Sequence, residues 1–201
     1  MREKLAGALG QQLCLRGGDR RPGNFGRRVS IYDLEVKTKA TKRSRTVTWE
    51  DPFEVLKAAP GKSGLEFLRE VFEGRLPPPP IAATMGFTGV EVEEGKAVFV
   101  GEPAEYLYNP IGTVHGGFAM TLLDSAMGCA IHTTMRVGER YTTLELKANF
   151  VRPITIETGR VRCEGVVIHR GGTIATAEAK LFAESTGKLL AHGTTTCLIS
   201  R

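Results

Sequence analysis

The sequence predicts an α+β fold in which a curved antiparallel β-sheet wraps around one long central α-helix. The first observation behind this is the segment 116–133, which is apolar on almost all sides, as is typical of a buried helix. The second is a run of strand-like segments that follows it without another helix, a pattern that favours an antiparallel sheet. We expect the sheet to cover one side of the helix and a partner subunit to cover the other.

The bulk composition indicates one globular domain. With 201 residues the chain is long enough for one well-packed domain with an extension and short for two. No apolar run approaches the roughly 20 residues of a membrane span, and the first residues contain no convincing signal peptide. The four cysteines have neither metal-ligand nor disulfide-framework spacing. We therefore expect reduced thiols in a cytoplasmic protein that does not associate with membranes.

The positive charge is concentrated in the first quarter of the chain. Residues 1–50 contain 12 Lys and Arg against 5 Asp and Glu, a local net charge of +7, whereas residues 51–201 contain 15 against 17, a local net charge of −2. The segment 16–28 is rich in Gly and Arg and too poor in apolar residues to bury a core. We expect a basic, poorly ordered extension at 1–50 and the folded domain at 51–201. A tail that binds nucleic acid or an acidic partner is the alternative; we favour the solvated extension and expect no nucleic-acid partner.

Three elements are predicted before the long helix. The Ser-x-x-Glu spacing at 63–66 is that of a capping box, and the apolar residues after it predict a short amphipathic helix at 63–73. The four prolines at 77–80 predict a rigid polyproline connector. From Gly89 onward, β-branched residues on both sides of Glu94-Gly95 predict two strands joined by a hairpin turn.

After the helix, four strands are predicted at 141–150, 159–169, 173–184 and 189–199. Turn signals separate them: Arg-Pro at 152–153, Arg-Gly-Gly at 170–172 and Ser-Thr-Gly at 185–187.

The start of the long helix carries the residues that point to chemistry. Glycines at 116 and 117 leave backbone N–H groups free where the helix dipole favours negative charge. Asn109 and His115 precede these glycines, and Asp124 is the only acidic residue in the helix. We expect this carboxylate to be buried, which is costly unless it is paired or used. An oxyanion-type donor, two polar neighbours and a buried carboxylate together indicate catalysis.

The spacing Asn-x5-His-Gly-Gly-x6-Asp over residues 109–124, followed by Asn-Phe-Val-Arg-Pro at 149–153, resembles the PaaI-like branch of the hotdog-fold acyl-CoA thioesterases. The resemblance covers roughly residues 50–201. It implies the hotdog fold and the hydrolysis of an acyl-CoA thioester to a carboxylic acid and free CoA.

Residue by residue, the resemblance implies four catalytic roles at the helix. Asp124 would activate water or attack the thioester carbonyl, and the backbone N–H of Gly116 would be the main oxyanion donor. Asn109 and His115 would position the thioester. From the residues alone, Asn109 can instead form only an Asx-type turn, and His115 can simply cap the backbone.

Further positions extend this candidate site. The resemblance implies that Thr142 helps orient the attacking water, with an offset of one to Thr143 left open. We also consider Gly117 as a substrate contact, and Arg152 and Arg170 as ligands for the phosphates of coenzyme A, because guanidinium groups suit phosphate. Several apolar residues of the helix are candidates to line an acyl pocket: Phe118, Met120, Leu122 and Met127.

The resemblance implies a dimer or tetramer in which the helix start of one subunit faces the carboxylate of the other. No cofactor and no metal ion is expected, since coenzyme A is part of the substrate. A hotdog-fold acyl-CoA hydratase or dehydratase is one rival, although the observed spacing disfavours it. A non-catalytic acyl-CoA-binding regulatory module is the other; a carboxylate facing the thioester argues against it.

Overall fold

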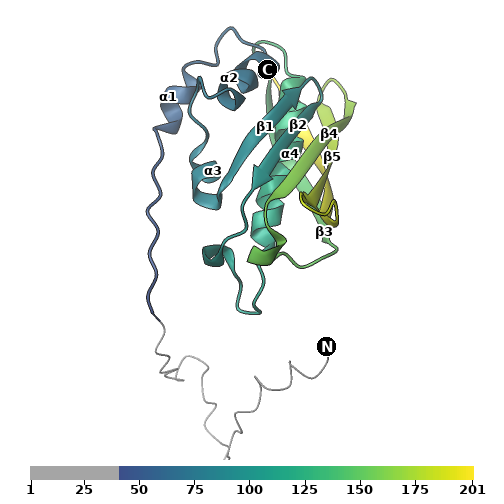
Figure 1. Cartoon of the computed structure of the whole chain (residues 1–201). Coiled ribbons are helices and arrows are strands. Elements are labelled where there is room, and N and C mark those ends of the chain that lie inside the picture. The colour runs from purple at the N-terminus through teal and green to yellow at the C-terminus, as the bar shows by residue number, and fades with distance from the viewer. Residues whose placement is uncertain (1–40) are drawn as a thin grey trace, which may run out of the picture. The chain divides into compact units, whose positions relative to one another are not determined.

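One long helix, α4 (Gly116–Thr133), lies in the curve of a six-stranded antiparallel sheet (Figure 1). The strand order is β1-β2-β4-β5-β6-β3, so β1 and β3 form the two edges. Because the sheet curves, α4 contacts all six of these strands. The predicted fold class is confirmed. The strands span β1 Phe87–Glu93, β2 Lys96–Gly101, β3 Arg140–Phe150, β4 Val161–Arg170, β5 Ile174–Ala183 and β6 Leu189–Ser200.

The computed structural model describes residues 41–201. Residues 1–40, most of the predicted basic extension, lie outside the described residues, and residues 41–50 contain no helix or strand. A compact unit begins at Arg45. Its guanidinium donates to the carbonyls of Ala83 and Thr84 at 2.6 and 2.8 Å and lies 3.9 Å from the ring centre of Tyr106. Among residues 41–201, no helix combines the length and apolarity needed to cross a membrane.

Two of the predicted local motifs form as expected. Ser63 caps α2 (Gly64–Phe72) through a reciprocal capping box: its Oγ accepts from the N–H of Glu66 at 3.3 Å, and its own N–H donates to the Glu66 carboxylate at 2.8 Å. Gly95 turns β1 into β2 with a φ of 76°, in the left-handed region that glycine adopts without strain.

Two short helices were not predicted. The prolines expected to form a connector at 77–80 end in α3 (Pro80–Met85), because proline at the first helical position has a suitable φ and needs no N–H partner. Asp51 caps α1 (Pro52–Leu56) by accepting from the N–H of Phe53 at 2.9 Å. Two 3₁₀ turns complete the elements, η2 at Glu105–Leu107 and η3 at Ile156–Thr158. The second one delays the predicted start of β4 to Val161.

Small residues on the inner face of the sheet bring α4 close to the strands. A Cβ added to Gly165 of β4 would lie 2.3 Å from the carbonyl oxygen of Ala126, so only glycine fits there. On β5 the buried positions Ala175, Ala177 and Ala179 carry only methyl groups. Fully buried α4 side chains such as Phe118 and Leu122 then occupy the space between the helix and the sheet. The helix that carries the candidate site is therefore rigidly held.

Candidate active site

The first turn of α4 leaves one backbone donor open. His115 is the N-cap, and its Nδ1 accepts from the N–H of Gly117 at 2.8 Å. The carbonyl of His115 accepts from the N–H of Phe118 at 3.0 Å. The N–H of Gly116 has no hydrogen-bond acceptor in the part of the chain from 41 to 201. At the positive end of the helix dipole, this N–H is available to a developing oxyanion.

Asn109 holds the loop that leads into the helix. Its side-chain Oδ1 accepts from the N–H groups of Ile111 and Thr113 at 3.0 and 3.3 Å, and its Nδ2 donates to the hydroxyl of Thr113 at 3.0 Å. These bonds form an Asx-type turn, the alternative that the residues alone left open. The Asn109 side chain therefore stabilises the conformation of this loop. The end of the loop is held by a 2.7 Å hydrogen bond from the His115 N–H to the carbonyl of Leu107.

Asp124 is exposed within the single chain. The expectation that this carboxylate is buried was therefore wrong for one chain on its own. The sheet and α2 cover the other faces of α4. The stripe that carries Gly117, Thr121 and Asp124 is half-buried or exposed, because residues 41–201 provide no cover there. A carboxylate two helical turns from the open N–H thus lies on the uncovered side of the helix.

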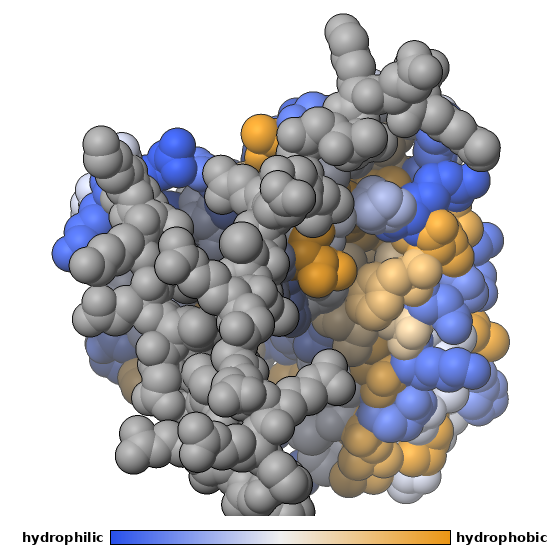
Figure 2. Space-filling model, turned by 90° about the horizontal axis from the view of Figure 1, so that it is seen from below, coloured by the Kyte–Doolittle hydropathy of each residue, from blue (hydrophilic) through white to orange (hydrophobic). Residues whose placement is uncertain are grey.

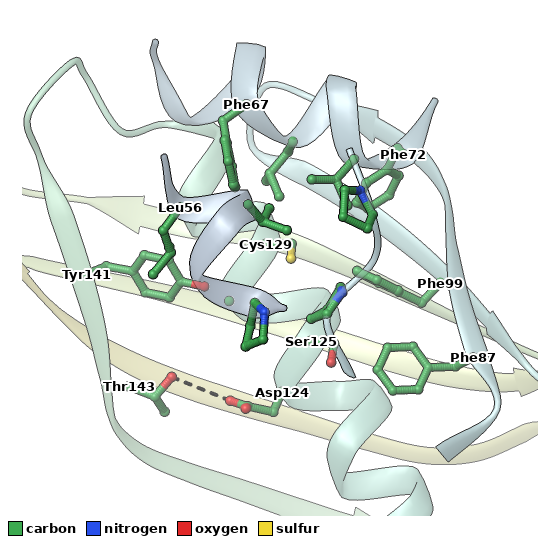
Figure 3. A pocket seen from close by; sticks show the side chains of 17 residues that line it. Leu56, Phe67, Phe72, Phe87, Phe99, Asp124, Ser125, Cys129, Tyr141 and Thr143 are labelled. Carbon is green, nitrogen blue, oxygen red and sulfur yellow. Dashed lines mark hydrogen bonds between the residues drawn. The ribbon is translucent and has the colours of Figure 1, made fainter. Parts of the chain in front are cut away.

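Thr143, and not Thr142, faces this carboxylate. The Thr143 hydroxyl donates to Asp124 Oδ1 over a long 3.4 Å bond (Figure 3). Thr142 is exposed on the other face of β3, since successive strand residues point to opposite faces. Partial desolvation raises the pKa of Asp124 above its ordinary value, and the bond from Thr143 acts against that rise. The carboxylate is therefore more basic than an ordinary surface aspartate.

Within one chain, the open N–H and the carboxylate do not meet. Gly116 and Asp124 are eight residues apart on the same helix, which corresponds to about 12 Å along its axis. One carbonyl group cannot contact both at this separation. The region around the helix start also carries exposed apolar side chains, among them Ile111 at 82%, Phe150 at 54% and Val151 at 45% exposure. Figure 2, seen from below the view of Figure 1, shows apolar side chains exposed among hydrophilic ones on the part of the molecule not drawn in grey.

The two candidate arginines lie at opposite ends of β3. Arg152 follows the end of β3 and donates to the carbonyl of Leu189 at 2.6 Å. Arg170 pairs with Glu139, which directly precedes the start of β3. An 11-residue strand spans roughly 36 Å, so one chain does not bring both arginines to one ligand. Only Arg152 lies at the end of the sheet where Phe150 packs against Gly116.

An apolar cavity of about 420 Å³ adjoins Asp124. We call it the acyl cavity, after the acyl group that the sequence resemblance led us to expect. The segment before the sheet supplies one wall through Leu56, Phe67 and Phe72. Strands β1 and β2 supply Phe87 and Phe99 on another side (Figure 3). The remaining wall comes from α4 and β3 and includes Asp124, Ser125, Gly128, Cys129, Tyr141 and Thr143. A cavity of this size and character is typical of small-molecule sites.

The expected pocket residues on α4 were the wrong ones. Phe118, Leu122 and Met127 are fully buried, and neither they nor Met120 line the acyl cavity. The cavity is lined instead by Phe67 and other side chains of the leading segment, which the sequence had not assigned to the site. One signal was available: an amphipathic helix at 63–73 needs an apolar surface to cover. The sequence did not reveal which surface that was.

The remaining titratable groups of the cavity are held neutral. Burial, and secondarily the charge of Asp124, raises the pKa of the Cys129 thiol to about 12, so it is a poor nucleophile at neutral pH. Burial likewise raises the pKa of the Tyr141 hydroxyl. Within residues 41–201, no group of three or more His, Cys, Asp and Glu side chains is arranged to hold a metal ion. Asp124 is the one carboxylate that lines the acyl cavity in this part of the chain.

Known proteins are similar to this chain in sequence. Residues 111–190 match the family model of the thioesterase superfamily. The chain is 32% identical over 107 residues to the 1,4-dihydroxy-2-naphthoyl-CoA hydrolase of Listeria monocytogenes. The aligned region covers 53% of this chain and 85% of that protein. It is 29% identical over 127 residues to human acyl-coenzyme A thioesterase 13, covering 63% and 89% of the two chains.

Solved structures share the fold. A phenylacetic acid degradation-related protein from Ralstonia eutropha superimposes with a TM-score of 0.58 at 27% identity, over 65% of this chain and 97% of that one. A mutant of the phenylacetic acid degradation protein PaaI from Thermus thermophilus gives a TM-score of 0.54 at 30% identity, over 60% and 98%. The chain therefore belongs to the thioesterase superfamily, as a hotdog-fold thioester hydrolase.

Proposed function

We propose that this protein hydrolyses acyl-CoA thioesters to the carboxylic acid and free CoA. The observation that carries the proposal is the position of Asp124, whose carboxylate adjoins an apolar cavity large enough for an acyl group. The raised pKa of this carboxylate and its bond to Thr143 support a base that is both more basic and oriented. The names of the related CoA thioester hydrolases support coenzyme A as the carrier.

The proposed reaction uses two groups on α4. In one route Asp124 removes a proton from water as the water oxygen bonds to the thioester carbon. In the other, its carboxylate attacks that carbon directly and water then hydrolyses the resulting anhydride. In both routes the carbonyl oxygen becomes an oxyanion that accepts a hydrogen bond from Gly116 N–H. When the oxyanion collapses, the C–S bond breaks and CoA departs as a thiolate that takes up a proton. In the second route this cleavage forms the anhydride, which water then hydrolyses. No cofactor takes part in this scheme.

A second copy of the chain is part of the proposal. Gly116 and Asp124 of one chain are too far apart to act on one carbonyl, so the donor and the carboxylate must come from different subunits. The uncovered stripe of α4 and the exposed side chains Leu144, Phe150 and Val151 on and after edge strand β3 support self-association on this side. A dimer is the minimum assembly, and a tetramer would repeat it. We place this assembly in the cytoplasm.

Release of free thiol from CoA thioesters, followed with a thiol-reactive dye, tests the proposed function. A panel of short, medium, long and aromatic acyl-CoAs should include substrates that release CoA in proportion to protein concentration. Hydration of enoyl-CoA without thiol release would instead support the hydratase alternative. Tight binding of acyl-CoA without turnover of any panel member would support a binding module and overturn the proposal.

A further inference from the structure

The acyl cavity has a larger neighbour. A second cavity of about 820 Å³ lies near the C-terminal end of α4. Its lining is more polar than that of the acyl cavity and includes Lys62, His132, Arg136 and Arg140. Three side chains line both cavities: Leu56 of α1, Phe67 of α2 and Tyr141 of β3. They lie between the apolar space beside Asp124 and the larger cavity beyond, and we call them the partition.

The partition closes one side of the acyl cavity. In Figure 3 its three side chains lie together on one side, while Phe87 and Phe99 lie on the opposite side. The imidazole of His132 supports the partition from behind: its ring centre lies 5.8 Å from that of Phe67 and 5.4 Å from that of Tyr141. Aromatic rings packed at such distances hold each other in defined orientations. Two of the three partition side chains are therefore fixed by packing, and Leu56, at 60% exposure, is the least restrained.

We infer that Leu56, Phe67 and Tyr141 set the maximum length of the acyl group by separating the acyl cavity from the larger cavity beyond. This inference rests on the proposed function, because it concerns the substrate of the same site. An acyl chain short enough to end at the partition buries all of its methylenes. A longer chain meets the partition and must either displace it, which costs packing energy, or leave methylenes in water, and each methylene kept from burial forfeits a gain of about fourfold in affinity. The protein should therefore prefer short and medium acyl groups over long ones.

Phe67→Ala is the main test, because it removes the ring that lies between the cavities. The measurement is the ratio of kcat/KM for palmitoyl-CoA to that for octanoyl-CoA, with palmitoyl-CoA kept below its micelle concentration. We expect this ratio to rise at least tenfold relative to wild type. Phe72→Ala is the matched control: it is the same change on the same helix, but Phe72 lines only the acyl cavity and packs against Phe99. Its ratio should stay within about threefold of wild type.

Leu56→Ala is a second variant for the case in which Phe67→Ala misfolds. Leu56 is exposed and α1 has no buried residues, so this change should leave the melting temperature nearly unchanged while partly opening the partition. If Phe67→Ala does not fold, Leu56→Ala alone tests the inference. Its ratio of kcat/KM for palmitoyl-CoA to that for octanoyl-CoA should rise at least threefold. An unchanged ratio in folded variants that still turn over octanoyl-CoA would overturn the partition and leave the proposed function intact.

A binding measurement separates this outcome from failure of the proposed function. Displacement of a fluorescent fatty acid by octanoate and by palmitate reports chain-length preference without catalysis. If wild type hydrolyses no acyl-CoA but Phe67→Ala shifts binding toward palmitate, the partition holds and the proposed hydrolysis fails. If neither binding nor turnover shifts, the partition is refuted.

Discussion

The two ends of α4 differ in how the chain covers them. At the C-terminal end α2 packs so closely that a Cβ on Gly64 would lie 1.8 Å from the carbonyl oxygen of His132. The Gly64 N–H donates to the carbonyl of Met135 at 3.0 Å. The Thr133 hydroxyl accepts from the N–H of Gly95 at 2.7 Å, which ties the β1–β2 turn to the same end. The carbonyls of Ala130, Ile131 and His132 at this end accept hydrogen bonds from Thr133, Thr134 and Met135.

The N-terminal end is left open. The N–H of Gly116 has no acceptor in residues 41–201, and Asp124, two turns further along, is exposed. The same helix is therefore a buried support at its C-terminal end, while it carries an open N–H at its start and an exposed carboxylate at its middle. A backbone donor without an acceptor and a carboxylate with a perturbed pKa are groups that a ligand or a second subunit can bind.

Loss of the Asp124 charge should have the largest effect on activity. Asp124→Asn keeps the shape of the side chain but removes the base or nucleophile, so kcat should fall by about 10²–10⁴-fold while KM changes little. Stability should not fall. The raised pKa means that the folded state disfavours the charged form, so this charge lowers the stability of the fold at pH values above that pKa. The melting temperature at neutral pH should thus be unchanged or higher.

Glu178→Gln is the control for this change, because it neutralises an exposed carboxylate of β5 that does not line the acyl cavity. Its kcat should match wild type. Near-normal turnover by a folded Asp124→Asn protein would end the mechanism proposed here.

Removal of the Gly116 N–H should have the next largest effect. Gly116→Pro deletes the donor at the first helical position, where proline is favoured, and the extended backbone of His115 suits a following proline. Loss of one oxyanion donor should lower kcat by about 10²–10³-fold. Gly116→Ala keeps the N–H and brings a methyl group 3.2 Å from the Phe150 ring. The kcat of Gly116→Ala should therefore fall much less than that of Gly116→Pro. Equal losses in both variants would point to packing instead of the donor.

Mixing the two defective proteins tests whether the open end is completed by a second copy. In a dimer of one Asp124→Asn subunit and one Gly116→Pro subunit, one shared site carries both changes and the other carries neither. Random exchange of subunits should therefore restore about a quarter of wild-type activity. If the donor and the carboxylate acted within one chain, the mixture would stay as inactive as its components. The active site would then be complete without a second subunit.

The sequence was most informative where a local rule has few alternatives. The limits of α4 follow from its apolar run and the glycines before it, and Ser63 and Glu66 fixed the start of α2 through their capping spacing. The Asn-His-Gly-Gly-Asp spacing identified the family correctly. Each of these signals depends only on neighbouring residues, so it survives without knowledge of the tertiary structure.

What the sequence could not provide depended on contacts between distant segments. Thr142 was preferred over Thr143 because one residue of register decides which face a strand side chain takes, and a β-bulge between Thr143 and Glu145 adds to the ambiguity. The exposure of Asp124 depends on which faces of α4 the rest of the chain covers. To predict the acyl cavity, one would have to know that Phe67 and Tyr141, more than 70 residues apart in the sequence, both pack against His132.

The choice between these two threonines can be tested at the open side of α4. Removing the Thr143 hydroxyl in Thr143→Val deletes the hydrogen bond that lowers the Asp124 pKa, so this pKa should rise further. Activity needs the carboxylate deprotonated, so the rise of kcat/KM with pH should move to higher pH. The bond is long at 3.4 Å, so the shift should be less than about one pH unit. Thr142→Val, on the other face of β3, should leave the profile unchanged; a shift in Thr142→Val alone would reverse the assignment.

The smallest effect is expected at the cap of the open end. His115→Ala removes the Nδ1 that accepts from Gly117 N–H, and loss of an N-cap costs about 1 kcal/mol. In a chain of this length the melting temperature should fall by roughly 2–4 °C. His115→Asn should recover most of that loss, because asparagine is a strong N-cap. If His115 only caps the helix, kcat should change less than tenfold in both variants, since Gly116 N–H stays in place. A drop of about 10²-fold in His115→Asn, with the melting temperature restored, would mean that the imidazole acts on the substrate, and the N-terminal end of α4 would then supply a side chain as well as a backbone donor.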